Sequence, residues 1–107
     1  MTNELIRVRS AIAAYKPPVE TINLDNLDRE DLWAFWREAS DEPQQVAERM
    51  FPEQRHCRLK VVRLLCRYAA CKATAMMCRL EGGIEAAMRN ERECDAIYVQ
   101  LPDFARW

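Results

Sequence analysis

The sequence predicts an all-α protein, a compact bundle of about four helices with a long central helix and a C-terminal αα-hairpin. Three observations favour this fold class. The chain has only two glycines, which are adjacent, whereas a β-rich domain needs glycine at many turns. Alanine, leucine, arginine, glutamate and methionine, which favour helices, are abundant. Apolar residues also recur at alternating spacings of three and four along one long segment.

A single domain is expected over residues 1–107, because this length can bury one core but not two. No apolar run approaches the ~20 residues of a membrane helix. Glu4 and two arginines lie near the start, where a signal peptide would be apolar. The five cysteines are irregularly spaced within helical pattern, which is typical of a reducing compartment. We therefore expect a cytoplasmic protein without a membrane span.

The first helix is predicted for residues 3–15, after the N-cap Thr2. Its apolar stripe consists of Leu5, Val8, Ile12 and Tyr15. Pro17 and Pro18 end it, because proline donates no hydrogen bond and disfavours a helical residue before it. An extended connector is expected to follow.

A second helix is predicted after the N-cap Asp28, in the stretch "LDREDLWAFWREAS". Its apolar face consists of Leu32, Phe35, Trp36 and Ala39, and Trp33 lies off that face. A short third helix is expected with Pro43 near its start and with Val46 and Met50 one turn apart.

The long central helix is predicted from about Glu53 to Leu80. One apolar face has an unbroken three-four spacing and consists of Leu59, Val62, Cys66, Ala69, Ala73, Met76 and Leu80. A second, roughly opposite, consists of Val61, Leu64, Tyr68, Cys71 and Ala75. A helix with two apolar faces needs a neighbour on each, so the second face is either core or the seam of a dimer. Lys60, Arg63 and Arg67 form a stripe between the two faces.

Gly82 and Gly83 predict the turn of the hairpin, since glycine adopts a left-handed backbone without penalty. The last helix is expected to end at Pro102, and its inward residues are Ile84, Ala87, Met88, Cys94, Tyr98 and Leu101. The segment "KATAMMCRLEGGIEAAMRNERECDAIYVQLPDFARW" resembles the C-terminal end of uncharacterised small helical proteins of phages and other mobile elements. This resemblance implies a phage or mobile-element origin and no particular activity.

Metal binding and catalysis are not expected. Tetrahedral zinc needs closely spaced ligand pairs, but Cys66 and Cys71, the closest cysteines, lie on different helix faces. The chain has one histidine and no phosphate-binding glycine loop or serine nucleophile motif. We therefore predict a protein that is not an enzyme and that uses no metal or cofactor.

The net charge of -1 hides a strong division along the chain, because residues 55–79 contain seven basic residues and no acidic one. Lys60, Arg63 and Arg67 could contact the phosphates of a nucleic acid. Alternatively, acidic residues of the flanking helices neutralise these charges within the same chain. The overall charge is slightly negative, which favours the second interpretation.

The aromatic residues and arginines favour a protein partner, since both are enriched at interface hot spots. We predict a non-enzymatic protein-interaction module that binds a host or phage protein through Trp33, Trp107, Arg63 and Arg67. A homodimer through the second apolar face of the long helix is also expected. The alternative functions are an accessory nucleic-acid-binding protein and a structural virion or assembly component. For the tail "DFARW", the alternative to contact with a partner is packing against its own hairpin.

Overall fold

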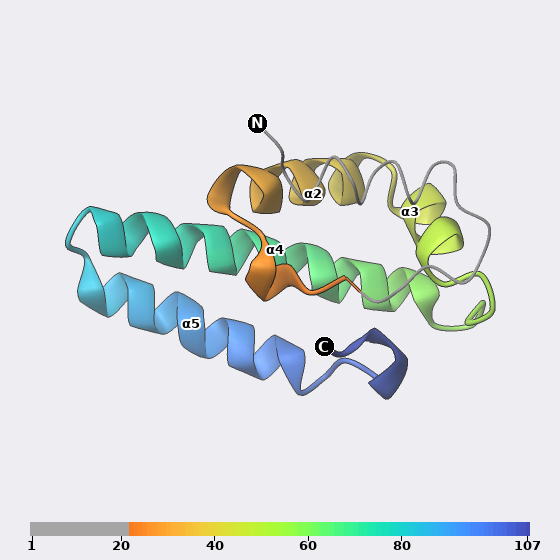
Figure 1. Ribbon diagram of the computed structural model, residues 1–107. Coiled ribbons are helices and arrows are strands. Elements are labelled where there is room, and N and C mark those ends of the chain that lie inside the picture. Colours follow the sequence, from red (N-terminus) through yellow and green to blue (C-terminus); the bar gives the residue numbers. More distant parts are fainter. Residues whose placement is uncertain (1–21) are drawn as a thin grey trace.

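The computed structural model describes residues 22–107 and confirms the all-α fold class over this range (Figure 1). Its elements are η1 (Leu24–Asn26), α2 (Arg29–Asp41), α3 (Pro43–Met50), α4 (Arg58–Leu80), α5 (Ile84–Tyr98) and η2 (Asp103–Ala105), where η denotes a 3-10 helix. The helix predicted for residues 3–15 lies outside the described residues.

Helices α2 and α3 begin where their sequence signals predict. The Asp28 carboxylate accepts a hydrogen bond from the Asp31 N–H at 2.8 Å, which satisfies a free amide at the start of α2. Pro43 is at the start of α3, where its missing N–H costs nothing. Both predicted N-termini are confirmed.

Helix α4 is the centre of the bundle and packs against α2, α3 and α5 (Figure 1). Its second apolar face is covered within the chain, because Val61, Tyr68 and Ala75 expose no more than 5 % of their surface. Neighbours on both sides explain why the helix is apolar on two faces. The face that we expected to form a dimer seam is therefore part of the core.

Helix α4 begins at Arg58, later than predicted. The preceding residues form turns, in which the N–H of Gln54 donates to the Phe51 carbonyl and the N–H of Cys57 donates to the Gln54 carbonyl. These turns redirect the chain from α3 into α4. The periodicity of the long segment could not distinguish such turns from the first turn of a helix.

The turn between α4 and α5 is confirmed at the two glycines, where Gly82 has a φ of 83° and the Gly83 N–H donates to the Cys78 carbonyl at 2.8 Å. The inward direction predicted for Ile84 and Met88 is wrong, since they are 47 % and 44 % exposed. Here α4 and α5 project beyond the end of α2 (Figure 1), so α2 does not cover them.

An aromatic clasp, which we define as Asp25, Tyr68, Tyr98 and Trp107, holds the tail against the bundle. The Trp107 ring lies edge-on to both tyrosine rings, with centroids 5.0 Å apart in each pair. One Asp25 oxygen accepts a hydrogen bond from Trp107 Nε1 at 3.0 Å, and the other accepts one from the Tyr68 hydroxyl at 2.7 Å. The Tyr98 hydroxyl donates to the main-chain oxygen of Trp107. The tail therefore packs against its own hairpin, as one of the two alternatives predicted.

The core runs between α4 and its neighbours, and its largest fully buried side chains include Phe35, Leu32, Leu65 and Ile97. Helix α5 ends at Tyr98, earlier than predicted, although Leu101 beyond it is buried. Across the part of the chain that the structure describes, every helix is too short or too polar to cross a membrane.

Candidate functional site

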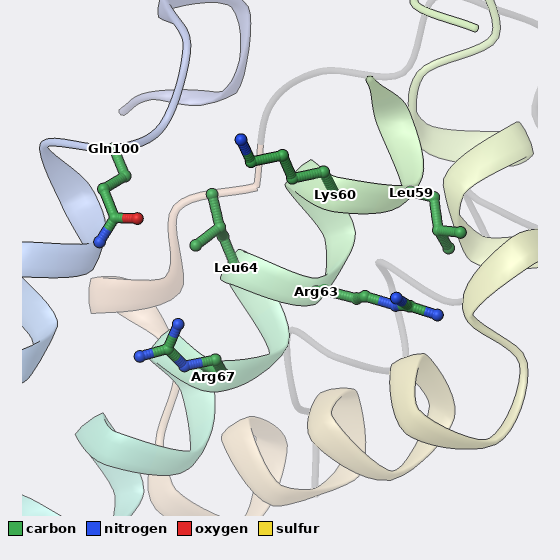
Figure 2. A pocket seen from close by; sticks show the side chains of 6 residues that line it. All are labelled: Leu59, Lys60, Arg63, Leu64, Arg67 and Gln100. Carbon is green, nitrogen blue, oxygen red and sulfur yellow. The ribbon is translucent and has the colours of Figure 1, made fainter. Parts of the chain in front are cut away.

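The stripe of Lys60, Arg63 and Arg67 lies on one side of α4, because spacings of three and four residues repeat about once per helical turn. All three side chains are exposed. Lys60 and Arg67 point toward the Gln100 side, and Arg63 points the other way (Figure 2). The stripe therefore presents positive charge to both sides of α4.

Two shallow pockets flank this stripe, and Arg63 and Arg67 border both of them. The first has a volume of about 430 Å³ and is lined by Leu59, Lys60, Arg63, Leu64, Arg67 and Gln100 (Figure 2). The second has a volume of about 450 Å³, and its remaining lining residues are Trp36, Ala39, Ser40, Pro43 and Cys66. We call the two pockets and the arginines between them the cationic groove.

The cations of the groove differ in their partners. Arg67 donates to the Glu93 carboxylate of α5 at 2.6 Å. Within residues 22–107, no carboxylate lies within 4.0 Å of the charged atoms of Lys60 or Arg63. Among the described residues, two positive charges of the groove therefore have no acidic partner.

Elsewhere on α4, acidic neighbours neutralise the basic residues. Arg79 donates two hydrogen bonds to Glu91, at 2.6 and 2.7 Å. The other pairs are Arg58 with Glu48 at 3.7 Å and Lys72 with Asp25 at 3.3 Å. Within residues 22–107, charge neutralisation thus accounts for four of the seven basic residues of the segment 55–79 but not for Arg55, Lys60 and Arg63.

Apolar and weakly polar side chains form much of the groove wall. The Cys66 thiol donates to the Trp36 carbonyl at 3.5 Å and lies 3.2 Å from the Ser40 hydroxyl. Burial raises the pKa of this thiol, and the hydrogen bond with Ser40 only partly opposes the shift. The Cys66 thiol is therefore protonated at neutral pH, which makes it a poor nucleophile. Its contribution to the groove is to line the wall of the second pocket.

The structure separates the four predicted contact residues. Arg63 and Arg67 lie together in the groove. Trp33 is half-buried and packs edge-on against Trp36, with ring centroids 5.6 Å apart, so it supports the groove wall and lines neither of the two pockets. Trp107 belongs to the aromatic clasp and is half-buried there. The predicted contact surface is therefore not one continuous patch.

Several groove residues, among them Trp36 and Gln100, were not predicted as site residues from the sequence. Trp36 was assigned to the core, but it is half-buried and lines the second pocket. The polar Ser40, one turn later on α2, marks the edge of the apolar face and could have indicated this exposure. Gln100 follows α5, and no local signal in the sequence relates it to Lys60.

Comparisons with known proteins identified no relative of this chain. The chain matches no protein-family model, no curated protein sequence and no solved structure.

Proposed function

We propose that the protein is a non-enzymatic interaction module that binds a segment of a partner protein in the cationic groove. The observation that supports this proposal best is that two pockets share Arg63 and Arg67 and combine cations with apolar walls. Its proposed context is the cytoplasm, which the irregularly spaced cysteines favour. Its proposed partner is a host or phage protein, in line with the phage or mobile-element origin that the resemblance of its C-terminal segment implies. No step of this function requires turnover.

The walls of the groove suit a peptide better than a uniformly charged polymer. Trp36 and Pro43 line one pocket, and Leu59 and Leu64 line the other. Apolar side chains of a partner can replace water on these walls, and the arginines can pair with its polar groups. Tryptophan and arginine supply much of the binding energy in protein interfaces, and both occur in this groove.

Nucleic acid is the second candidate ligand, because Lys60 and Arg63 lack acidic partners among the described residues. The surroundings oppose it. Asp41 and Glu42, between the pocket residues Ser40 and Pro43, are exposed. They would repel a phosphate backbone, which carries a charge at every step, more than a peptide that can place an uncharged residue beside them. Three cations also supply fewer phosphate contacts than the roughly 6–10 of a strongly salt-dependent nucleic-acid complex. We therefore rank a protein segment above nucleic acid.

A selection from a displayed random-peptide library tests the proposal. Peptides would be selected on the wild-type protein and counter-selected on the double variant Trp36→Ala/Arg63→Glu, which alters both the wall and the charge of the groove. The matched control is Arg55→Glu, because Arg55 is exposed on the same basic segment but lies outside both pockets. We expect enriched peptides that bind the wild type and the control equally and the double variant at least about tenfold more weakly.

Two results would contradict the proposal. One is a selection that enriches no groove-dependent peptide. The other is tight binding of a single-stranded or duplex oligonucleotide that Arg63→Glu abolishes and that weakens steeply between low and physiological salt, which would favour the nucleic-acid function.

The homodimer stays a prediction, and its seam has to lie outside the second apolar face, which is buried. Light scattering behind a sizing column determines the state directly. A salt-stable dimer would support the prediction, a monomer would contradict it, and higher oligomers would favour the assembly-component alternative.

A further inference from the structure

We propose that the cationic groove selects an acidic segment of the partner, and that Glu93 is an internal competitor which this segment displaces from Arg67. This inference rests on the proposed function, since it specifies the chemistry of the ligand and the control of the same site. It concerns a residue that lines neither pocket.

The geometry of the Arg67–Glu93 pair is the first observation. Glu93 comes from α5 and accepts a hydrogen bond from Arg67 at 2.6 Å. The guanidinium of Arg67 thus already holds a carboxylate at the border of the two pockets. Both side chains remain open to water, with 57 % and 46 % of their surface exposed. An ion pair this exposed contributes little to stability, so a carboxylate from another molecule can replace Glu93 at small cost.

The positive charges of Lys60 and Arg63 are the second observation. Lys60 lies on the Gln100 side of α4 and Arg63 points to the opposite side (Figure 2). Neither has a carboxylate within ion-pair distance among residues 22–107. A ligand that crosses the stripe therefore meets a positive charge on each side, and a segment with a carboxylate for each side complements both.

The walls favour a ligand that carries apolar as well as charged side chains. Trp36 and Pro43 on one side and Leu64 on the other form apolar surface beside the cations. A bound segment gains most when apolar side chains cover these walls and its acidic groups reach the cations. We therefore infer a ligand in which acidic and apolar residues are interspersed.

The test uses the peptides from the selection described above. We expect the groove-dependent peptides to be acidic, with a net negative charge and interspersed apolar residues. Replacement of their Glu and Asp by Gln and Asn should weaken binding at least about tenfold in fluorescence anisotropy at low salt, because charge-assisted hydrogen bonds are lost.

A matched pair of variants tests the competitor. Glu93→Gln frees Arg67 and should tighten binding of the acidic peptide about threefold, the size expected when an exposed ion pair no longer competes. Glu91→Gln is the control, because Glu91 also lies on α5 and pairs with an arginine of α4, Arg79, which lines neither pocket. Its peptide affinity should match the wild type.

The outcomes separate this inference from the proposed function. Groove-dependent peptides that are neutral or basic would overturn the acidic ligand and leave the interaction module intact. Equal affinities for Glu93→Gln and Glu91→Gln would overturn the competitor alone. A competition experiment separates carboxylate from phosphate ligands. If inorganic phosphate or an oligonucleotide displaces the bound peptide more effectively than an unlabelled glutamate-rich peptide does, the groove is a site for phosphate ligands.

Discussion

At the scale of single residues, Asp25 carries the polar contacts of the aromatic clasp. Its carboxylate accepts hydrogen bonds from Trp107 and Tyr68, and the Lys72 ammonium lies 3.3 Å away. Partial burial raises the pKa of this carboxyl, but the contacts with Trp107, Tyr68 and Lys72 outweigh it and hold the pKa below its usual value. The folded state therefore favours the ionised form of Asp25 more than the unfolded chain does.

The variant Asp25→Asn should unfold more easily than the wild type by about 1 kcal/mol at pH 7. The expected loss of stability is smaller than for a fully buried hydrogen bond to a charged group, because 42 % of the Asp25 side chain is exposed to water. The contribution should be complete above the unfolded pKa, near 3.8, and should disappear as the pH falls through the lower folded pKa. Urea denaturation at pH 7 and at about pH 2 measures both limits.

The control for this experiment is Asp103→Asn, whose carboxylate is fully exposed and 3.5 Å from Arg106. It should leave the free energy of unfolding unchanged at either pH. The stability loss of Asp25→Asn relative to the wild type should be smaller at about pH 2 than at pH 7. If the loss is the same at both pH values, the charge of the carboxylate is not its source.

At the scale of elements, the hairpin of α4 and α5 depends on its glycine turn. Gly82 has a φ of 83°, in the left-handed region, whereas Gly83 has a φ of -85°. A methyl group on Gly83 would lie 3.6 Å from the Cys78 carbonyl oxygen, which is ordinary contact. The two neighbouring glycines therefore have different roles, although the sequence presents them as equivalent.

We expect Gly82→Ala to lower the free energy of unfolding by about 1–2 kcal/mol, because a left-handed backbone is strained for alanine. Gly83→Ala should change it by less than about 0.5 kcal/mol, since the site has room and an ordinary φ. Chemical denaturation followed by circular dichroism compares the two. Equal losses for both variants would contradict the assignment of the turn to Gly82.

Much of the element layout could be predicted from the sequence because its signals are local. Asp28, Pro43 and the glycine pair each mark a boundary through backbone chemistry within a few residues. The exposure of Ile84 and Met88 could not be predicted, because it depends on how far α4 and α5 project beyond α2. Periodicity identifies an apolar face but not whether a neighbour is long enough to cover it.

The candidate site was predictable to the same degree. The Lys60, Arg63 and Arg67 stripe follows from helical spacing alone. Its pockets require the packing of α2 and the end of α5 against α4, which no local pattern encodes. The contacts of Trp107 could not be predicted for the same reason, since its partners Asp25 and Tyr68 are distant in the sequence.

At the scale of the whole molecule, the aromatic clasp joins the segment before α2 to the segment after α5. Trp107 contacts Asp25 in η1, Tyr68 on α4 and Tyr98 on α5. The tail has a second attachment, where Phe104 packs edge-on against Phe51 with ring centroids 5.2 Å apart. The described bundle is thus closed by contacts between its two ends.

Trp107→Ala should destabilise the protein by about 2–3 kcal/mol, the loss expected for truncating a half-buried tryptophan. Trp107→Phe should lose less, because it keeps a ring between the tyrosines and removes only the N–H donated to Asp25. Thermal and urea unfolding measure both variants, with Arg92→Ala, an exposed side chain of α5 outside the clasp, as the control. A loss for Trp107→Ala no greater than that of the control would refute the closing role of the clasp.

The clasp also has a consequence for the order in which the protein folds. Asp25 and Trp107 are 82 residues apart, whereas the α4–α5 hairpin brings together residues such as Arg79 and Glu91, 12 residues apart. Closing a long chain segment costs more entropy than closing a short one, so the hairpin can form before the clasp closes. Losing the clasp should therefore accelerate unfolding and leave the folding rate nearly unchanged. We therefore expect the clasp to determine the lifetime of the folded state and the hairpin to determine the folding rate.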